Sequence, residues 1–289
     1  MVVLKMNAYL LIICLIGLYN TGLATSEQRN CLIPKNLQGS WFSWEYGYPA
    51  QTVIDATSMT RDGDYIYVKQ HHDDCINFEQ HHDNEYSFVF KEQTAKCFKC
   101  VRTFMRTPNL FEKLESECVS LAPGEEPTVE NVCKDIKDDQ RLITLFNENY
   151  VPTDCRSSLD GVWHFTHQNR YRFTGVCDKP DARINSCQTG GTPNQKFNIT
   201  YQQCEGIEGT FSDTFEFSCL GDWFVGEKHY FAAVNPKESR KTEKYRCFLK
   251  NRDDDLYVGA SITPECNVLR TPQTSPERWQ LTPVKPGCT

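Results

Sequence analysis

The chain has 289 residues and a formal net charge of −7, with basic and acidic residues mixed along its length. This balance excludes a typical nucleic-acid-binding surface, which would show a basic stripe, and it argues against electrostatic docking on anionic lipid. Aromatic residues make up 12% of the chain, so the chain is able to bury a substantial core.

The first predicted element is a secretory signal peptide over residues 1–24. Lys5 precedes an apolar run at 8–19, and Gly22 and Ala24 stand where a signal peptidase prefers small residues. The run is too short for a transmembrane helix, which needs roughly 20 apolar residues. We therefore expect cleavage near Ala24 and a secreted mature chain without a membrane span.

Export predicts oxidised cysteines and a glycan. Of the 15 cysteines, Cys14 leaves with the signal peptide, and the even number that remains argues for disulfides whose partners the sequence does not give. The remaining cysteines are Cys31, Cys75, Cys97, Cys100, Cys118, Cys133, Cys155, Cys177, Cys187, Cys204, Cys219, Cys247, Cys266 and Cys288. Asn198 begins the sequon Asn-Ile-Thr and is the predicted glycosylation site.

Two similar openings divide the mature chain into two cysteine-rich modules, which we place at 25–150 and 151–289. Residues 37–41 are Leu-Gln-Gly-Ser-Trp, and residues 159–163 are Leu-Asp-Gly-Val-Trp. Each follows a cysteine and a short spacer, and a looser copy, Leu-Gly-Asp-Trp, stands at 220–223. An internal repeat of this kind indicates a repeated structural unit.

Elsewhere the pattern is mostly β. Short runs rich in aromatic and β-branched residues, separated by turn residues, predict the strands of a sandwich or a meander barrel. These runs cover 64–69, 85–91, 196–201, 209–211, 215–217, 229–234, 244–249 and 256–260. Short helices are predicted at 109–117 and at 128–136, the second with Pro127 at its start. The predicted fold class is therefore mostly β, with two disulfide-rich antiparallel modules, each a barrel or half-barrel.

The Leu-x-Gly-x-Trp openings resemble the Gly-x-Trp signature of lipocalin-like barrels. In that family the tryptophan closes the floor of the barrel, and the glycine lets the first strand approach it. The resemblance implies these roles for Gly39 with Trp41 and for Gly161 with Trp163. The sequence shows no arginine partner for either tryptophan, which departs from the lipocalin pattern.

Longer segments are similar to a group of cysteine-rich extracellular arthropod proteins described by domains of unknown function. The similar segments are 154–165, 170–175 and 194–200 in the second module, and 37–45 and 96–100 in the first. This resemblance covers most of the mature chain and implies no activity. The layout of the two openings also resembles a Wnt-inhibiting ectodomain built of two lipid-binding half-barrels.

Four of the seven histidines lie at 71–72 and 81–82, among acidic residues and close to Cys75. Imidazole and carboxylate groups at such spacings are able to bind Zn²⁺ or Cu²⁺. Because neighbouring residues of a strand face opposite sides, only one histidine of each pair would reach a shared site in a hairpin. His72 and His82 are the candidate ligands, and a solvated polar loop is the alternative.

Cys97 and Cys100 have the C-x-x-C spacing of redox-active cysteines. The catalytic form of that motif needs its first cysteine at the start of a helix, where the thiolate is stabilised. Here a strand-like segment follows at 101–104. Positions three apart on a strand face opposite sides, so we expect the two sulfurs to bond to different partners.

The sequence lacks the recognisable motifs of common enzymes, such as G-x-S-x-G, H-E-x-x-H, the P-loop and G-x-G-x-x-G. We therefore predict a non-enzymatic extracellular binding protein without a cofactor. Its partner would be a lipid or small hydrophobic molecule in contact with Trp41 and Trp163, with Trp223 as a third candidate. An interaction module for another extracellular protein is the alternative, followed by a secreted hydrolase.

Overall fold

The computed structural model describes residues 31–63, 70–137, 139–155, 159–187, 195–252 and 254–288. Residues Cys31–Thr289 form one compact unit. The predicted signal peptide at 1–24 and the predicted strand at 64–69 lie outside the described residues. Among the helices that the structure describes, none has the length and apolar character needed to span a membrane.

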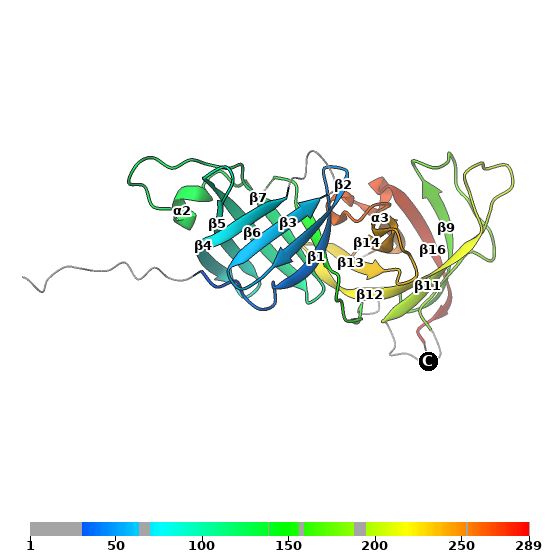
Figure 1. Ribbon diagram of the computed structural model, residues 1–289. Helices are drawn as coiled ribbons and strands as arrows, with labels where there is room; N and C mark the ends of the chain where they lie inside the picture. The colour runs from blue at the N-terminus through cyan, green and yellow to red at the C-terminus, as the bar shows by residue number, and fades with distance from the viewer. Residues whose placement is uncertain are drawn as a thin grey trace, which may run out of the picture. The chain divides into compact units, whose positions relative to one another are not determined.

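The N-terminal part of the described chain forms a closed antiparallel barrel (Figure 1). Each of its eight strands is hydrogen-bonded to the next in sequence, and β8 returns to pair with β1. The strands are β1 (Gly39–Glu45), β2 (Tyr48–Ile54), β3 (Ser58–Gly63), β4 (His71–His82), β5 (Glu85–Glu92), β6 (Cys97–Thr107), β7 (Leu110–Glu115) and β8 (Ile143–Asn147). This is the strand order of an up-and-down barrel, in which closure removes the sheet edges.

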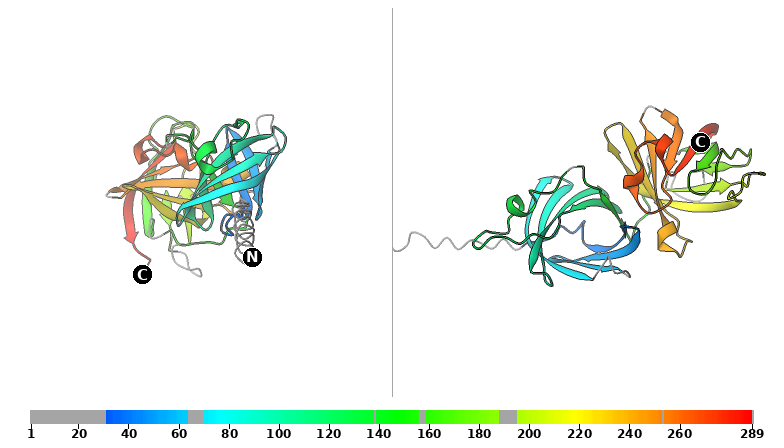
Figure 2. Two further views of the ribbon diagram at one scale, coloured as in Figure 1. Left: turned by 90° about the vertical axis from the view of Figure 1, so that its left-hand side faces the viewer. Right: turned by 90° about the horizontal axis from the view of Figure 1, so that it is seen from above.

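The C-terminal part repeats the same topology, and the strands of each barrel wrap around their own interior (Figure 2). Its strands are β9 (Gly161–Asn169), β10 (Arg183–Asn185), β11 (Lys196–Tyr201), β12 (Asp213–Val225), β13 (Lys228–Val234), β14 (Tyr245–Asn251), β15 (Asp254–Ala260) and β16 (Glu277–Pro286). Strand β16 pairs with β9 and closes the barrel. The predicted fold class is confirmed, and both modules are closed barrels, not half-barrels.

Within the described ranges the helices are few and short, as predicted. They are α2 (Val129–Val132), α3 (Lys241–Lys244) and the two 3₁₀ turns η1 (Cys266–Val268) and η2 (Pro272–Thr274). Helix α2 falls within the predicted helix at 128–136, and the hydroxyl of Thr128 caps it by accepting from the amide of Asn131 at 3.2 Å. The helix predicted at 109–117 is wrong, because this segment forms β7 and pairs with β6 and β8.

The Leu-x-Gly-x-Trp segments open the two barrels in the same way. The indole N–H of Trp41 donates to the carbonyl of Leu37 at 2.9 Å, and that of Trp163 donates to the carbonyl of Asp160 at 3.1 Å. Leu37 and Leu159 are buried in the cores of their respective barrels. The sequence repeat is therefore a structural repeat, in which each tryptophan is fixed to the turn that precedes the first strand.

The glycines of these openings have a conformational role. Gly39 and Gly161 have φ values of +133° and +110°, a region that favours glycine. A Cβ at Gly161 would also lie 2.3 Å from the carbonyl oxygen of Lys285, so this position has no room for a side chain. The looser copy at 220–223 lies within β12 and opens no barrel.

Large side chains fill the interiors of both barrels. Trp41 is fully buried and packs edge-on against Phe111, with ring centroids 4.6 Å apart. In the second barrel Phe248 stacks on Phe231 at 4.7 Å and lies 5.5 Å from Trp279. A hollow at one end of this core measures about 10 Å³, room for about one water molecule. Aromatic and aliphatic side chains therefore occupy much of the described interior of each barrel.

The N-terminal barrel also holds charged side chains in its interior. Lys113 is 1% exposed, and its Nζ lies 3.0 Å from Glu115 Oε2 and 3.6 Å from Glu45 Oε1. The guanidinium of Arg61 forms ion pairs with the same two carboxylates. An unpaired buried charge costs several kcal/mol of folding free energy. Removing one charged member of this network is therefore expected to destabilise the barrel.

All fourteen predicted cysteines are paired, and each pair lies within one module. The disulfides are Cys31–Cys75, Cys97–Cys118, Cys100–Cys133, Cys155–Cys219, Cys177–Cys204, Cys187–Cys288 and Cys247–Cys266. Cys97 and Cys100 have different partners, as expected for two positions on β6. The C-x-x-C segment is therefore structural.

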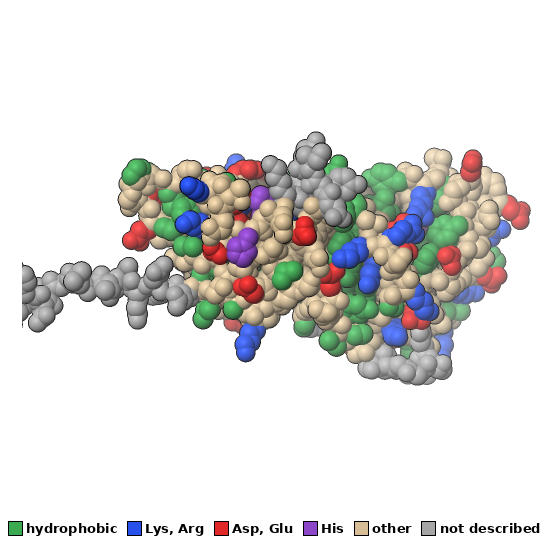
Figure 3. Space-filling view, in the orientation of Figure 1, with side chains coloured by type: hydrophobic (Ala, Val, Ile, Leu, Met, Phe, Trp, Pro, Cys, Tyr) green, Lys and Arg blue, Asp and Glu red, His purple; other side chains and the backbone are tan. Residues whose placement is uncertain are grey.

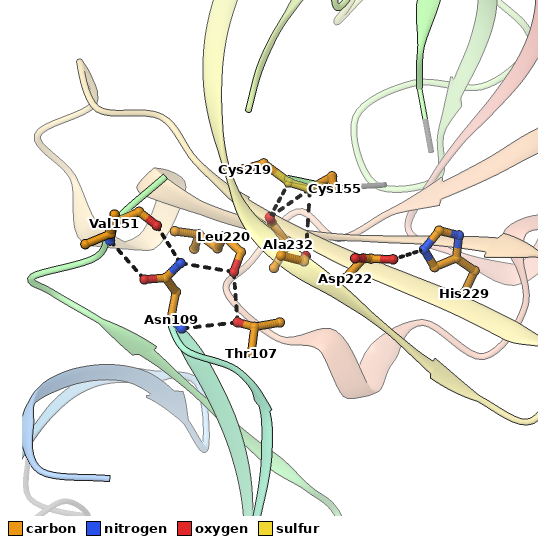
Figure 4. Close-up of a disulfide and its surroundings, with 10 residues drawn as sticks. Thr107, Asn109, Val151, Cys155, Cys219, Leu220, Asp222, His229 and Ala232 are labelled. Atoms are coloured by element: carbon orange, nitrogen blue, oxygen red, sulfur yellow. Dashed lines mark hydrogen bonds and ion pairs between the residues drawn. A yellow bond between two sulfur atoms is a disulfide. The ribbon is translucent and has the colours of Figure 1, made fainter. Parts of the chain in front are cut away.

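The two barrels share a buried cluster built from the outer faces of both. Phe146 of β8 stacks on Tyr245 of β14, with ring centroids 4.8 Å apart. Hydrogen bonds join the same region: the amide of Asn109 donates to the carbonyls of Val151 at 2.7 Å and Leu220 at 3.2 Å (Figure 4). The Asn109 Oδ1 also accepts from the Val151 amide at 2.9 Å. The barrels are therefore in direct contact through side chains and backbone.

Candidate ligand-binding groove

The structure separates the three tryptophans that the sequence nominates as ligand contacts. Trp41 and Trp163 lie against the cores of their barrels, where side chains fill the neighbouring space. Trp223 instead points outward from β12 into the cluster shared by the two barrels, and it is 7% exposed. Of the three, Trp223 lines a groove formed by the described residues.

This groove has a volume of about 550 Å³ and lies where the two barrels meet. The N-terminal barrel contributes residues of β6, of β7 and of the segment 139–142, and the C-terminal barrel contributes β12, β13 and the segment 266–270. The lining side chains with the clearest chemical roles are Arg106, Glu112, Trp223, Lys228, Tyr230 and Arg270. Its volume falls within the usual range of small-molecule sites, about 300–1,000 Å³.

Trp223 and Tyr230 form an aromatic wall in the groove. They are cross-strand partners in β12 and β13, and their rings stack 5.6 Å apart with an interplanar angle of 11°. The Tyr230 hydroxyl donates to the carbonyl of Leu269 at 3.0 Å, which holds the ring in place. Burial raises the pKa of Tyr230, and the nearby carboxyl of Glu112 adds to this shift. The hydroxyl is therefore a neutral donor at physiological pH.

Charged side chains surround this wall. Glu112 is 4% exposed, and Arg106 Nε donates to its Oε2 at 2.7 Å. Burial raises the pKa of Glu112, and Arg106 opposes that shift. Lys228 and Arg270 also line the groove, and neither has an ion-pair partner among the residues described. The groove thus combines an apolar wall with two cations that have no ion-pair partner within the described ranges of the chain.

A second groove, of about 410 Å³, includes Phe42 and Lys241 in its lining. Its basic groups already have partners. Lys241 Nζ lies 2.6 Å from Glu148 Oε1, and Arg240 pairs with two neighbouring glutamates on the surface. Because its charges are satisfied and no aromatic pair lies in its lining, this groove is the weaker candidate.

The candidate metal ligands His72 and His82 do not lie close enough to share an ion. Strand β4 runs without a turn from His71 to His82, so the two histidine pairs stand at its opposite ends. At about 3.3 Å per residue, His72 and His82 are about 33 Å apart along this strand, too far to share an ion. His72 instead contacts Thr60 Oγ1 at 2.9 Å and Asp74 Oδ1 at 3.2 Å. Figure 3 shows histidine side chains at the surface of this barrel.

Three potential metal-ligating atoms do come together at Glu92, Cys97 and Cys118, within 4.8 Å of one another. Both sulfurs belong to one disulfide, so neither is the thiolate that a metal ion would need. Glu92 pairs instead with Lys99 Nζ at 2.9 Å and with His71 Nδ1 at 3.1 Å. Burial opposes the ionisation of Glu92, but Lys99 and His71 outweigh it and lower the pKa. This cluster is therefore an ion-pair network.

Asn198 lies in β11 and alternates with Phe197 and Ile199, which are buried in the barrel core. Its side chain therefore faces outward, and it is half-buried. The Asn198 Oδ1 is buried without a hydrogen-bond partner among the described residues. Glycosylation takes place on the other amide atom, Nδ2, and it stays a prediction.

Sequence reasoning did not identify most of the groove. The residues that it missed are Arg106, Glu112, Lys228, Tyr230 and Arg270. They come from separate segments that only tertiary packing brings together. The sequence did contain one signal for the aromatic pair. A two-residue turn at 226–227 joins β12 to β13, and this turn makes Trp223 the cross-strand partner of Tyr230.

Two family models match the chain, and both are defined without a function. Residues 29–138 match "Domain of unknown function (DUF7044)", and residues 153–283 match "Domain of unknown function (DUF7042)". No curated protein and no solved structure matches the chain. The two matches and the seven disulfides agree with the expected cysteine-rich modules of unknown function.

Proposed function

We propose that the chain is a secreted, non-enzymatic binding protein that holds a small apolar or amphipathic molecule in the groove between its barrels. The observation that supports this most directly is the stacked pair Trp223–Tyr230 in a groove of about 550 Å³. Small-molecule sites of this size combine apolar walls with a few placed polar groups. The ligand is therefore expected at Trp223, and not beside Trp41 or Trp163.

The wall is already formed in the free protein, which favours binding. A ligand that covers about 100 Å² of apolar surface gains about 2–3 kcal/mol before the costs of association. Tyr230 is anchored to Leu269 through its hydroxyl, and Trp223 is nearly buried. Little side-chain freedom is therefore lost when a ligand binds.

Cysteine chemistry supports the proposed location outside the cell. All the cysteines that the structure describes are joined in seven disulfides. Such bonds form and persist in oxidising compartments and are rare in the cytosol. The proposal therefore places the groove in the extracellular fluid, where its ligand would be a soluble molecule or one released from a membrane.

Docking of another extracellular protein is a second candidate function. Phe224, Val225 and Leu256 are between 46% and 51% exposed, and they lie in β12 and β15 near neighbouring hairpin turns. Exposed apolar side chains are one mark of protein contact sites, and here they lie on both faces of β12, because Phe224 and Val225 are neighbours on one strand. Val225 also lines the groove, so one set of variants tests both candidates.

Binding of the neutral fluorescent probe N-phenyl-1-naphthylamine tests the proposed groove. We expect saturable binding to the wild-type protein and a loss of affinity of about tenfold or more in Val225→Glu, since the probe would have to desolvate the added carboxylate. Trp223→Ala should also lose binding, because it removes half of the aromatic wall. Fluorescence titration of each purified variant measures the affinity.

Two controls accompany this titration. Tyr171 is 73% exposed and lies outside the groove lining, so Tyr171→Ala should bind the probe like the wild-type protein. Thermal unfolding of Trp223→Ala shows whether that variant is folded, and Val225→Glu tests the site without removing a buried side chain. Unchanged probe affinity in both Val225→Glu and folded Trp223→Ala would refute the proposed site.

A further inference from the structure

The groove carries more positive charge than the carboxylates in the described part of the chain neutralise. Four basic and two acidic residues line it, in a chain whose formal net charge is −7. Two of the basic residues are paired, Arg106 with Glu112 at 2.7 Å and Arg141 with Glu265. The other two basic residues have no ion-pair partner in the described part of the chain. The positive charge of the groove is therefore local, against an acidic background.

The first of these residues, Lys228, stands at one end of the aromatic wall. Lys228 is the cross-strand partner of Val225, just as Tyr230 is the partner of Trp223. Residues two apart on a strand face the same side, about 6–7 Å from each other. The Lys228 ammonium is therefore placed to contact a group at the end of a molecule that lies on the Trp223–Tyr230 wall.

The second, Arg270, lies beside the anchored end of Tyr230. It follows Leu269, whose carbonyl accepts the Tyr230 hydroxyl at 3.0 Å. Burial raises the pKa of Tyr230, and Arg270 and Arg106 both oppose that shift, so both guanidinium groups act electrostatically on the hydroxyl. Arg270 is thus a second cation that lines the groove close to the aromatic wall.

We infer that the ligand of this groove is an anionic amphiphile, with a carboxylate or sulfonate group held by Lys228 and Arg270 and an apolar body on Trp223 and Tyr230. The inference rests on the proposed function and adds the charge of the ligand. The negative charge of the whole chain does not prevent this, since charges more than about 8 Å away are largely screened at physiological ionic strength. The neighbouring cations therefore determine which ligands the groove selects.

Two probes with the same aromatic body separate the effect of charge from that of shape. 1-Anilinonaphthalene-8-sulfonate carries a sulfonate, and N-phenyl-1-naphthylamine lacks it. We expect the sulfonate probe to bind the wild-type protein at least about tenfold more tightly, because charge-assisted hydrogen bonds are the stronger ones. Lys228→Met combined with Arg270→Met should remove this advantage and change the affinity for the neutral probe by less than about twofold.

A matched control and a salt series sharpen the comparison. Lys237 is an exposed lysine outside the groove lining, and Lys237→Met should leave the binding of both probes unchanged. Raising the NaCl concentration from about 0.05 M to about 0.5 M should weaken binding of the sulfonate probe and not of the neutral one. Displacement of the sulfonate probe by dodecanoate or by 1-naphthoate would show whether the preferred body is a chain or a ring.

The outcomes distinguish this inference from the proposed function. Equal affinity of the two probes for the wild-type protein would overturn the inference that the ligand is an anion. Unchanged affinity for the sulfonate probe in the variant with both Lys228→Met and Arg270→Met would also overturn it. The same holds if neither dodecanoate nor 1-naphthoate displaces the sulfonate probe. If the neutral probe fails to bind at all, the proposed groove function itself is wrong.

Discussion

Replacing Lys113 with methionine is expected to lower the free energy of unfolding by about 3–5 kcal/mol. Lys113 is 1% exposed inside the N-terminal barrel, with its ammonium 3.0 Å from Glu115 and 3.6 Å from Glu45. Methionine keeps most of the side-chain volume but removes the positive charge. The carboxylates of Glu45 and Glu115 would then share one cation of this network, Arg61. Because domains are commonly stable by only 5–15 kcal/mol, this barrel should unfold at a clearly lower urea concentration. Circular dichroism during urea titration measures the change.

A double variant shows whether unbalanced charge is the cause. In Lys113→Met combined with Glu115→Gln, Arg61 and Glu45 remain as one balanced pair, and we expect a large part of the lost stability to return. A double variant as unstable as Lys113→Met alone would mean that packing, and not charge, is responsible. A Lys113→Met protein that unfolds at the wild-type urea concentration would show that the network contributes nothing.

Acid should weaken the wild-type protein through the same network. Burial opposes the ionisation of Glu115, but Lys113 and Arg61 outweigh it and lower the pKa from 4.5 to about 2. Between these two values the unfolded chain binds a proton that the folded chain does not. The stability from this carboxylate is therefore complete above pH 4.5 and is lost as the pH falls toward about 2. Urea titrations at about pH 5.5 and about pH 3 should differ less for Lys113→Met than for the wild-type protein.

The repeated openings were predictable because their causes are local. Trp41 bonds to a carbonyl four residues before it, and Trp163 bonds to one three residues before it. Gly39 and Gly161 supply the positive φ values that these turns require. A pattern whose constraints lie within five residues is visible in the sequence, and its repetition predicted two similar β modules.

The strand β7 was not predictable from the sequence. Apolar and polar residues do not alternate along it, as they usually do along a strand with one buried face. The segment Leu110–Glu115 has apolar residues at 110, 111 and 114, which is a helical spacing. In the barrel, Phe111, Lys113 and Glu115 share one face, and two of them are charged because they belong to the buried network. Only the partners on other strands explain these charges.

The predicted metal site and the groove illustrate the same limit. His72 and His82 would come together only if the chain turned between them, but β4 continues and pairs with β5 along most of its length. Arg106 and Arg270 are far apart in sequence, and the contact between the barrels brings them to one groove. Spacing along the chain predicts neither result, because the first depends on where β4 ends and the second on how the two barrels pack.

Phe146→Ala is expected to destabilise the protein by about 3–5 kcal/mol and to affect both barrels. Phe146 is 0% exposed on the outer face of β8 and stacks on Tyr245 of the other barrel at 4.8 Å. Tyr245 also stacks on Phe42 at 5.3 Å, so one ring of the C-terminal barrel contacts two rings of the N-terminal barrel. Truncation would open a cavity between the barrels, and neither barrel alone is able to close it.

Hydrogen exchange tests whether this cluster couples the barrels. A large apolar interface restrains relative domain motion, so Phe146→Ala should speed the exchange of the β14 amides at Tyr245–Asn251. Phe88→Ala is the matched control, because Phe88 is 2% exposed inside the N-terminal barrel and its truncation loses a similar apolar area. That control should lower stability and leave β14 exchange unchanged. Equal effects of the two variants on β14 would mean that the shared cluster does not couple the barrels, since general destabilisation would then explain both.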